Sequence, residues 1–236
     1  MRILVAIPCL YNAPVCYEAI NSVLNRRGID VLLMDNGAEQ DVKDVLEKFK
    51  EYTNVTVLHE PTNIYVNPAW QKFIDYFLAH SAYDHLVIMN SDIFMNHDFH
   101  HIIKTIWHTF PEHCLVPNIV DRDQVKERMA LDAYMFQQLH SGIAGVFITL
   151  SRRQAKIISP LPAEIKIWFG DTYVYSILDS IGEMIVVPNN LLAHHVGSET
   201  VKRLPELQEV LDEDKVQWET VVKPRMEEKI KQLKEQ

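Results

Sequence analysis

The sequence predicts an α/β fold in which a mostly parallel sheet is flanked by helices on both faces. Four short apolar runs have the length of buried strands: Ile3–Ile7, Val31–Met34, Val55–Leu58 and Leu86–Met89. The stretches between them carry apolar residues at helical spacing, at Ala13–Asn25, Asp41–Tyr52 and Pro68–Leu78. Near-continuous apolar strands that alternate with helices are typical of a parallel sheet covered on both faces.

The second half of the chain is less regular. Helices are expected at Phe99–Thr109, Arg152–Ile158 and Trp168–Leu178, and short strands at Cys114–Pro117, Ile143–Leu150, Met184–Val187 and Leu191–His195. The stretch Gln124–Leu139 mixes polar and apolar residues and is ambiguous, with a helix as the first option.

The last part of the chain is rich in Glu and Lys and has a narrow apolar stripe. It reads as one or two helices from Pro205 onward, broken or kinked at Pro224. We therefore expect one domain over residues 1–204 and a C-terminal helical extension over residues 205–236. The extension has three options: to pack on the domain, to clamp an acceptor, or to form a homo-oligomer. Its stripe is too irregular for a coiled coil.

Composition narrows the class of protein. The net charge of −9 over 236 residues argues against a general nucleic-acid-binding surface. The three cysteines, Cys9, Cys16 and Cys114, lack zinc-site spacing and indicate no disulfide framework. No signal peptide precedes the first strand, and no apolar run has the length of a membrane span. These features together predict a cytoplasmic protein.

Polar or sharply turning residues follow three of the predicted strands, as Pro8–Asn12, Asp35–Gly37 and Asn90–Asp92. The carboxyl ends of parallel strands meet at one edge of a sheet, where ligands bind. Pro8 and Tyr11 suit the walls of a site for a flat base, Asp35 suits the imino N–H of a pyrimidine, and Asn36 suits a carbonyl. No glycine-rich phosphate loop follows the first strand. Phosphates must therefore be held by a metal ion or by side chains.

The stretch Asn90-Ser91-Asp92 is the candidate metal site. A carboxylate beside an amide and a hydroxyl suits a divalent cation that carries a phosphate. The alternative is that Asp92 caps a helix or closes a turn. The ordered polar ends of the other strands favour a metal–diphosphate site.

Two later motifs carry further candidates. Asp171 follows Trp168-Phe169-Gly170, and an aspartate among aromatic residues can act as a general base, although Asp is also a common helix N-cap. His194 and His195 offer imidazole ligands for a metal such as manganese. Because adjacent strand residues point to opposite faces, we expect one of the two to face the site. A pair of loop histidines without a metal is the alternative.

The ordered set of motifs over roughly residues 1–200 resembles the GT-A glycosyltransferases, and family 2 in particular. The similar pieces are Ile3–Asn12, Val31–Gly37, Glu60–Asn63, Asn90–Asp92, Ser141–Gly145, Phe169–Asp171 and His194–Thr200. The resemblance implies a Rossmann-like GT-A sheet that binds a nucleotide-sugar donor, most simply a UDP-sugar, together with Mn²⁺ or Mg²⁺.

The resemblance also implies roles for individual residues. Asp171 would deprotonate the acceptor, Asp92 would bind the metal, and His194 or His195 would complete its ligands. Gly142 and Gly145 would lie beneath the donor sugar. The remaining donor-binding residues would be Pro8, Tyr11, Asp35, Asn36, Asn63, Asn90 and Ser91.

Four features depart from the family's pattern. Asn90 replaces the first acidic residue of the DxD motif, and Gly170 replaces the acidic residue that commonly precedes the base. The stretch after Asn63 lacks the family's glycine, and Trp70-Gln71 stand where an Asn is usual.

The predicted function is metal-dependent transfer of a sugar to a hydroxyl acceptor with inversion, because a single base would act opposite the leaving group. The acceptor options are a glycan, a lipid-linked precursor, a small molecule or a modified nucleobase. Two other readings are nucleotidyl transfer and non-catalytic binding of a nucleotide-sugar as a scaffold. Nucleotidyl transfer usually uses a glycine-rich amino-terminal loop, which does not follow Ile7.

Overall fold

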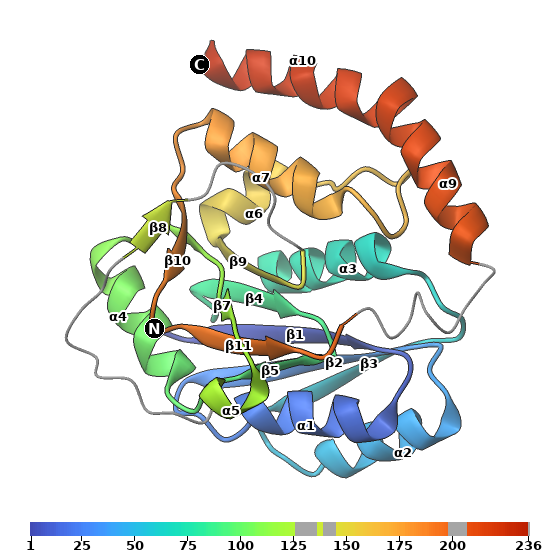
Figure 1. The fold of residues 1–236 in the computed structure, drawn as a ribbon, viewed down its shortest axis with the longest axis vertical. Coiled ribbons are helices and arrows are strands. Elements are labelled where there is room, and N and C mark those ends of the chain that lie inside the picture. The colour runs from blue at the N-terminus through green and yellow to red at the C-terminus, as the bar shows by residue number, and fades with distance from the viewer. Residues whose placement is uncertain (126–135, 139–144, 198–206, 236) are drawn as a thin grey trace.

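The computed structural model describes residues 1–125, 136–138, 145–197 and 207–235, and its centre is a five-stranded sheet (Figure 1). The strands run in the order β3-β2-β1-β4-β9. They are β1 (Ile3–Cys9), β2 (Ile29–Asn36), β3 (Val55–Glu60), β4 (His85–Met89) and β9 (Phe147–Ser151). The first four are parallel, and β9 pairs with β4 in the antiparallel direction. The predicted mostly parallel sheet is therefore confirmed.

Helices cover both faces of this sheet, as predicted. Residues of α1 (Ala13–Val23), α2 (Gln40–Phe49) and α4 (Phe99–Thr109) share one core cluster, and residues of α3 (Val66–Ala79), α6 (Arg152–Ile158) and α7 (Gly170–Ser180) share the other. Side chains of β1 alternate between the two clusters: Ile3, Val5 and Ile7 pack on one side, Leu4 and Ala6 on the other. Each large apolar side chain buried in this way contributes about 1.5–3 kcal/mol.

Two small sheets extend the fold after β4. One has the order β5-β11-β7, formed by Ile93–Met95, Leu192–His195 and Asn118–Ile119; the other has the order β6-β10-β8, formed by Cys114–Leu115, Ile185–Pro188 and Phe136–Gln138. In the antiparallel pair β5 and β11, His195 lies opposite Ile93. This pairing brings a segment from the end of the domain next to Asp92.

The ambiguous stretch Gln124–Leu139 does not form the single helix given as its first option. A short helix α5 (Arg122–Val125) ends at its beginning, and Phe136–Gln138 is strand β8, which pairs with β10. Pairing with another strand decides the structure of such a short segment, and its own sequence carries no signal of that partner. The residues between these two elements lie outside the described part of the chain.

The C-terminal helix packs on the domain. It consists of α9 (Leu207–Gln217), a π-helical turn (Trp218–Val222) and α10 (Lys223–Lys234), which follow one another without a break. Pro224 lies in the first turn of α10 and has no N–H to continue an α-helical ladder, which suits a widened turn before it. Its buried face includes Leu211, Trp218, Val222 and Met226. The apolar stripe thus contacts the chain's own domain through the α7 side of the core.

Within the described ranges, no helix combines the length and apolar character needed to cross a membrane.

Candidate active site

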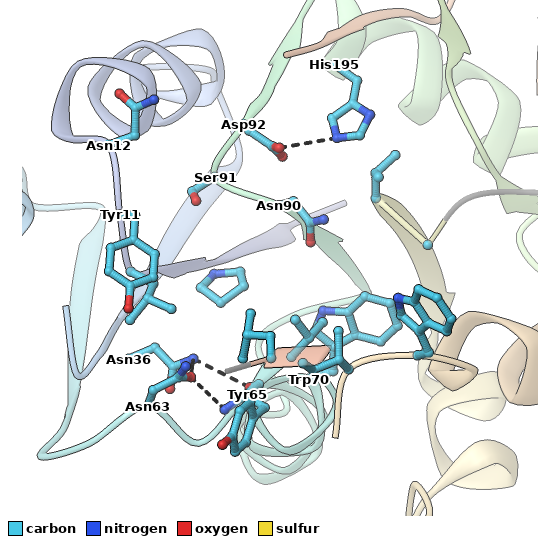
Figure 2. A pocket seen from close by; sticks show the side chains of 18 of the residues that line it. Tyr11, Asn12, Asn36, Asn63, Tyr65, Trp70, Asn90, Ser91, Asp92 and His195 are labelled. Carbon is cyan, nitrogen blue, oxygen red and sulfur yellow. Dashed lines mark hydrogen bonds and ion pairs between the residues drawn. The ribbon is translucent and has the colours of Figure 1, made fainter. Parts of the chain in front are cut away.

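A cavity of about 310 Å³ opens at the carboxyl edge of the parallel strands (Figure 2). It brings together most of the residues that the sequence singles out: Pro8, Tyr11, Asn36, Asn63, Asn90, Ser91, Asp92, Gly145, Asp171 and His195. These residues come from the ends of β1, β2 and β4, from the loop after β3, from the turn before β9, from the start of α7 and from β11. The predicted convergence of the strand ends therefore occurs. Gly142 lies outside the described residues.

One end of the pocket is a corner built by two asparagines. Asn36, at the end of β2, donates from Nδ2 to Asn63 Oδ1 at 3.2 Å and to the Tyr65 carbonyl at 3.4 Å, and its Oδ1 accepts from the Ile64 N–H at 3.0 Å. Asn63 Oδ1 also accepts from the Tyr65 N–H at 2.8 Å. Both amide groups are thus held in fixed orientations, and Tyr65 has a left-handed φ of 68°. A rigid polar corner of this kind suits the edge of a base.

Asp35 lies behind this corner and does not line the cavity. Its carboxylate is buried, accepts from the Ala38 N–H at 2.8 Å and lies 3.2 Å from His59 Nδ1. Gly37, two residues after Asp35, turns the chain with a φ of 68°, and a Cβ there would lie 2.8 Å from the Thr62 Cα. The Asp35 carboxylate therefore closes the turn that places Asn36 in the pocket.

Asp92 and His195 meet on the opposite side of the pocket. Asp92 Oδ2 lies 3.2 Å from His195 Nε2, while its Oδ1 is buried and has no hydrogen-bond partner among the described residues. The Val196 N–H donates to the Asp92 carbonyl at 3.0 Å, which ties β11 to this turn. His194 points elsewhere, with its Nδ1 3.0 Å from the Val120 carbonyl. Of the two predicted histidines, His195 is therefore the one that contacts Asp92.

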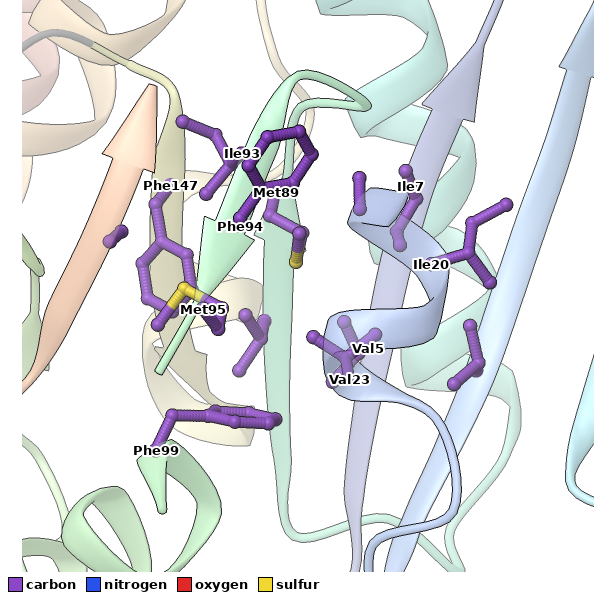
Figure 3. Packing of buried hydrophobic residues seen from close by; sticks show 14 of the residues in the cluster. Val5, Ile7, Ile20, Val23, Met89, Ile93, Phe94, Met95, Phe99 and Phe147 are labelled. Atoms are coloured by element: carbon purple, nitrogen blue, oxygen red, sulfur yellow. The ribbon is translucent and has the colours of Figure 1, made fainter. Parts of the chain in front are cut away.

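The core fixes the turn that carries Asp92. Met89 before it and Ile93 after it are both 0% exposed, and Phe94 and Met95 continue into the same cluster beside Phe147 (Figure 3). Because both flanks of Asn90-Ser91-Asp92 are buried, the three polar side chains between them are held at the pocket.

Asp92 and His195 offer a fitting half-site for a divalent cation. No group of three or more His, Cys, Asp or Glu side chains that could hold a metal occurs within the described ranges. An unpartnered buried carboxylate oxygen beside an imidazole nevertheless supplies two ligands of the kinds that manganese accepts. The remaining positions would fall to donor oxygens and water, as is common for cations bound together with a phosphate.

Asp171 lies on the first turn of α7 and contacts the backbone before β9. Its Oδ2 accepts from the Gly145 N–H at 2.9 Å, and its Oδ1 accepts from the Thr172 N–H at 2.7 Å. Phe169, with a φ of 64°, occupies the N-cap position of this helix, so Asp171 is not its N-cap. A Cβ on Gly145 would lie 2.5 Å from the Asp171 Cβ, which shows how closely the two segments approach.

One wall of the pocket was not predicted from the sequence. This wall is formed by Trp70 of α3, by Ile167 and Trp168 before α7, and by Leu207 of α9. The Trp70 side chain is buried, and its indole Nε1 has no hydrogen-bond partner in the part of the chain that the structure describes. Apolar residues at these positions look like ordinary core residues, and nothing in their spacing signals a ligand.

Two buried groups near the pocket are held in their neutral forms. The side-chain hydrogen bond with Cys16 and burial raise the pKa of the Cys9 thiol, so Cys9 is no thiolate nucleophile. Burial, with smaller contributions from Cys114 and Asp171, raises the pKa of Tyr175 well above its ordinary value. Its hydroxyl donates to the Phe147 carbonyl at 3.3 Å and helps to join α7 to β9.

Comparisons with known proteins agree with this geometry. Residues 4–151 match the family described as glycosyl transferase family 2. Among curated proteins, no sequence matches.

Several solved structures share the fold. TarS residues 1–349 from S. aureus is 12% identical with a TM-score of 0.64, and the alignment covers 94% of this chain and 73% of that one. The mannosyltransferase PcManGT from Pyrobaculum calidifontis, in complex with GDP-Man and Mn²⁺, is 13% identical with a TM-score of 0.64, covering 98% and 73%. GalNAc-T7 with UDP, GalNAc and Mn²⁺ is 10% identical with a TM-score of 0.66, covering 83% and 44%. Because the family match spans more than half of its length, this chain belongs to glycosyl transferase family 2 and is a glycosyltransferase with a GT-A fold.

Proposed function

We propose that this glycosyltransferase moves a sugar from a UDP-sugar to a hydroxyl acceptor, with a divalent metal ion and with inversion at the anomeric carbon. The observation that carries the proposal is the placement of Asp92 and Asp171 in one pocket that also contains the asparagine corner. Such a transfer needs a carboxylate that binds the metal, a group that accepts the acceptor's proton, and a site for the nucleobase of the donor. Family membership favours this reaction over nucleotidyl transfer and over a scaffold role.

The donor would lie between the asparagine corner and Asp92. Pro8 and Tyr11 line the pocket beside Asn63, which supports a role for them as the walls around the nucleobase. Asn90 and Ser91 supply polar groups between the corner and Asp92, suited to the ribose and the diphosphate. The roles predicted for Asp35 and Gly142 stay predictions.

Asp92 and His195 would hold the metal ion. When bound, this ion would act as a Lewis acid that neutralises charge on the diphosphate. The chain's own contribution is to keep an anionic oxygen free for it: Asp92 Oδ1 is buried and unpartnered among the described residues, while Oδ2 contacts His195. Asn90 adds no charge at the position where the family commonly has an acid, so the carboxylate of Asp92 carries this task.

Asp171 would take the proton of the acceptor hydroxyl. Oδ2 accepts one hydrogen bond, from the Gly145 N–H, and Oδ1 accepts from the N–H and, at 3.4 Å, the hydroxyl of Thr172. These bonds fix the orientation of the carboxylate and leave a lone pair on Oδ2 to accept a proton. As the proton moves to Asp171, the acceptor oxygen forms a bond to the anomeric carbon, and the bond from that carbon to the diphosphate breaks. A single base opposite a single leaving group gives direct displacement, which inverts the configuration.

A donor screen tests the proposal. UDP-, GDP- and dTDP-sugars are compared by thermal shift with Mn²⁺, and the donor with the largest shift is then assayed for release of its nucleoside diphosphate. Asp171→Asn is expected to bind this donor as the wild type does and to lose at least a hundredfold in turnover, within the range typical of a lost general base. Asp179→Asn, the same change at an exposed position of α7, is the control. Equal turnover by Asp171→Asn and the wild type would contradict the base role.

A further inference from the structure

A carboxylate on the C-terminal helix binds the segment that leads to Asp171. Asp214 of α9 is 0% exposed. Its Oδ1 accepts from the Lys166 N–H at 2.8 Å, and its Oδ2 accepts from the N–H groups of Ile167 and Trp168 at 2.7 and 2.8 Å. These three consecutive residues belong to no helix or strand, so regular structure offers their N–H groups no partners. Charge-assisted bonds of this kind are among the stronger ones in proteins.

The other edge of the same segment is bound by α3. The Asn67 N–H donates to the Lys166 carbonyl at 2.9 Å, and Asn67 Nδ2 donates to the carbonyls of Ile165 and Trp168 at 3.3 and 3.0 Å. Asn67 binds carbonyl groups, whereas Asp214 binds N–H groups. The backbone of residues 165–168 is therefore fixed from two sides by two buried polar side chains.

Ring contacts join the same helix to the residues nearest Asp171. Phe169 stacks on Trp218 with ring centroids 4.9 Å apart and an interplanar angle of 10°, and Lys215 Nζ lies 5.2 Å from the centre of the Trp168 ring. Leu207, at the start of α9, lines the pocket itself. The C-terminal helix thus contributes a residue to the pocket wall.

We propose that Asp214 is a positioning residue of the active site, which fixes residues 166–168 and thereby places Asp171 and the wall formed by Ile167 and Trp168. The inference rests on the proposed function, in which Asp171 is the base. Asp171 follows Trp168 by three residues, so the anchored backbone sets where its helix begins. A displacement of about 1 Å in a reacting group is enough to cost a hundredfold in rate. The C-terminal helix is in this view a working part of the catalytic domain.

The test uses the full-length protein and the variant Asp214→Asn, which keeps the size of the side chain and replaces one accepting oxygen by an NH₂ donor. Turnover of the donor selected above is expected to fall at least tenfold, while the Kd for UDP with Mn²⁺, measured by calorimetry, stays within twofold. Hydrogen exchange is expected to show lost protection in peptides that cover residues 165–169, with β1 and β4 unchanged.

Two control variants separate positioning from stability. Glu213→Gln changes the neighbouring exposed carboxylate, which pairs with Lys166 Nζ at 3.2 Å, and is expected to leave turnover unchanged. Met226→Ala removes a buried side chain of α10, eight residues beyond Trp218. It is expected to lower the Tm while turnover, measured well below the Tm, stays within twofold.

Two results would overturn the proposal. The first is turnover of Asp214→Asn within twofold of the wild type. The second is a loss of turnover in Met226→Ala as large as that in Asp214→Asn when both variants lose the same amount of Tm. A wild type that releases no UDP, GDP or dTDP from any donor would defeat the proposed function on its own, and the catalytic role of Asp214 with it. The exchange measurement then still decides the structural part, because retained protection in Asp214→Asn would overturn the anchoring of residues 166–168.

Discussion

The side chain of Asn67 occupies the space in which a side chain on residue 170 would begin. A Cβ on Gly170 would lie 2.7 Å from the Asn67 Cγ and closer still to Oδ1. Asn67 is 1% exposed and cannot move aside without releasing the carbonyl groups that it binds. Two departures from the family's pattern, the altered stretch after Asn63 and the glycine before Asp171, thus lie in contact. With Asn67 in this place, residue 170 has no room for a side chain.

This contact predicts coupled effects of substitution. Gly170→Ala should lower the free energy of unfolding by about 1–3 kcal/mol, because the added methyl overpacks a filled site. Asn67→Ala removes the obstacle as well as its hydrogen bonds, so the double variant should be more stable than the two single effects predict, by about 1 kcal/mol or more. Urea unfolding of the four proteins measures this coupling energy. Strictly additive effects would show that the two residues are independent.

Gly145→Ala should impair turnover more than stability. The new Cβ would lie 2.5 Å from the Asp171 Cβ and 2.9 Å from Trp70 Cη2, so it would displace Asp171, the proposed base. We expect at least a tenfold fall in turnover with an unchanged Kd for UDP. Gly182→Ala is the control, because its Cβ would meet nothing within 4 Å. Its φ of 78° is unfavourable for alanine, so this change should lower stability without displacing Asp171. If both variants lose turnover alike, displacement of Asp171 is not the cause.

The two adjacent histidines should differ in their effect on metal binding. His195 contacts Asp92 in the pocket, whereas His194 contacts the Val120 carbonyl. His195→Ala should therefore weaken Mn²⁺ affinity about tenfold or more, a size typical of a lost group at or near a metal. The Mn²⁺ dependence of the thermal shift given by UDP measures this affinity, and His194→Ala should leave it unchanged. A larger effect of His194→Ala would reverse the assignment.

The free energy of unfolding should fall on acidification because of His100, a buried residue of α4. Burial, with the positive charges of His101, Lys104 and Arg26, lowers the pKa of His100 to about 4. In the unfolded chain its pKa is about 6.5, so the unfolded state binds the proton first as the pH falls. Above about pH 6.5, His100 is neutral in both states and does not make the free energy of unfolding depend on pH. Between about pH 6.5 and about pH 4 the free energy of unfolding falls, by up to about 3 kcal/mol.

His100→Gln should flatten this dependence, and His108→Gln, at an exposed position of the same helix, is the control. Urea unfolding between pH 4 and 7 gives the slopes. A remaining slope is expected, since burial also lowers the pKa values of His85 and His113. Equal slopes for His100→Gln and the wild type would contradict the prediction.

The product should have the opposite anomeric configuration to the donor. The prediction follows from Asp171, which apart from Asp92 is the only carboxylate among the described residues that line the pocket. NMR of the first product formed, recorded before mutarotation, identifies the configuration. Retention would exclude Asp171 as the base of a direct displacement.

The parallel strands and their polar ends were predictable because each leaves a local signal. Helices α4 and α6 match their predicted ranges, Phe99–Thr109 and Arg152–Ile158, at both ends. Strands β5, β7 and β8 are two or three residues long, too short to show a period, and their pairing partners lie far away in sequence. The ends of β1, β2 and β4 could be placed in one pocket because parallel strands share an edge.

The anchoring residues left no such signal. Asp214 stands between Glu213 and Lys215 in a charged helix and looks like one more solvated side chain. Its burial depends on how α9 packs on the domain, and tertiary packing of this kind cannot be read from the local sequence. The same holds for Asn67, whose partners lie about 100 positions further along the chain.

The π-helical turn at Trp218–Val222 sets the rotational phase of the C-terminal helix. In a regular α-helix each residue advances by about 100°, so buried positions spaced four apart, as Trp218, Val222 and Met226 are, would drift around the axis. A wider turn absorbs the surplus residue and keeps both halves of the helix facing the same domain. Loss of a single residue here would rotate α10 relative to α9 by about 100°. The number of residues between Asp214 and Met226 therefore matters as much as their identity, because it decides whether α9 and α10 can pack on the domain at the same time.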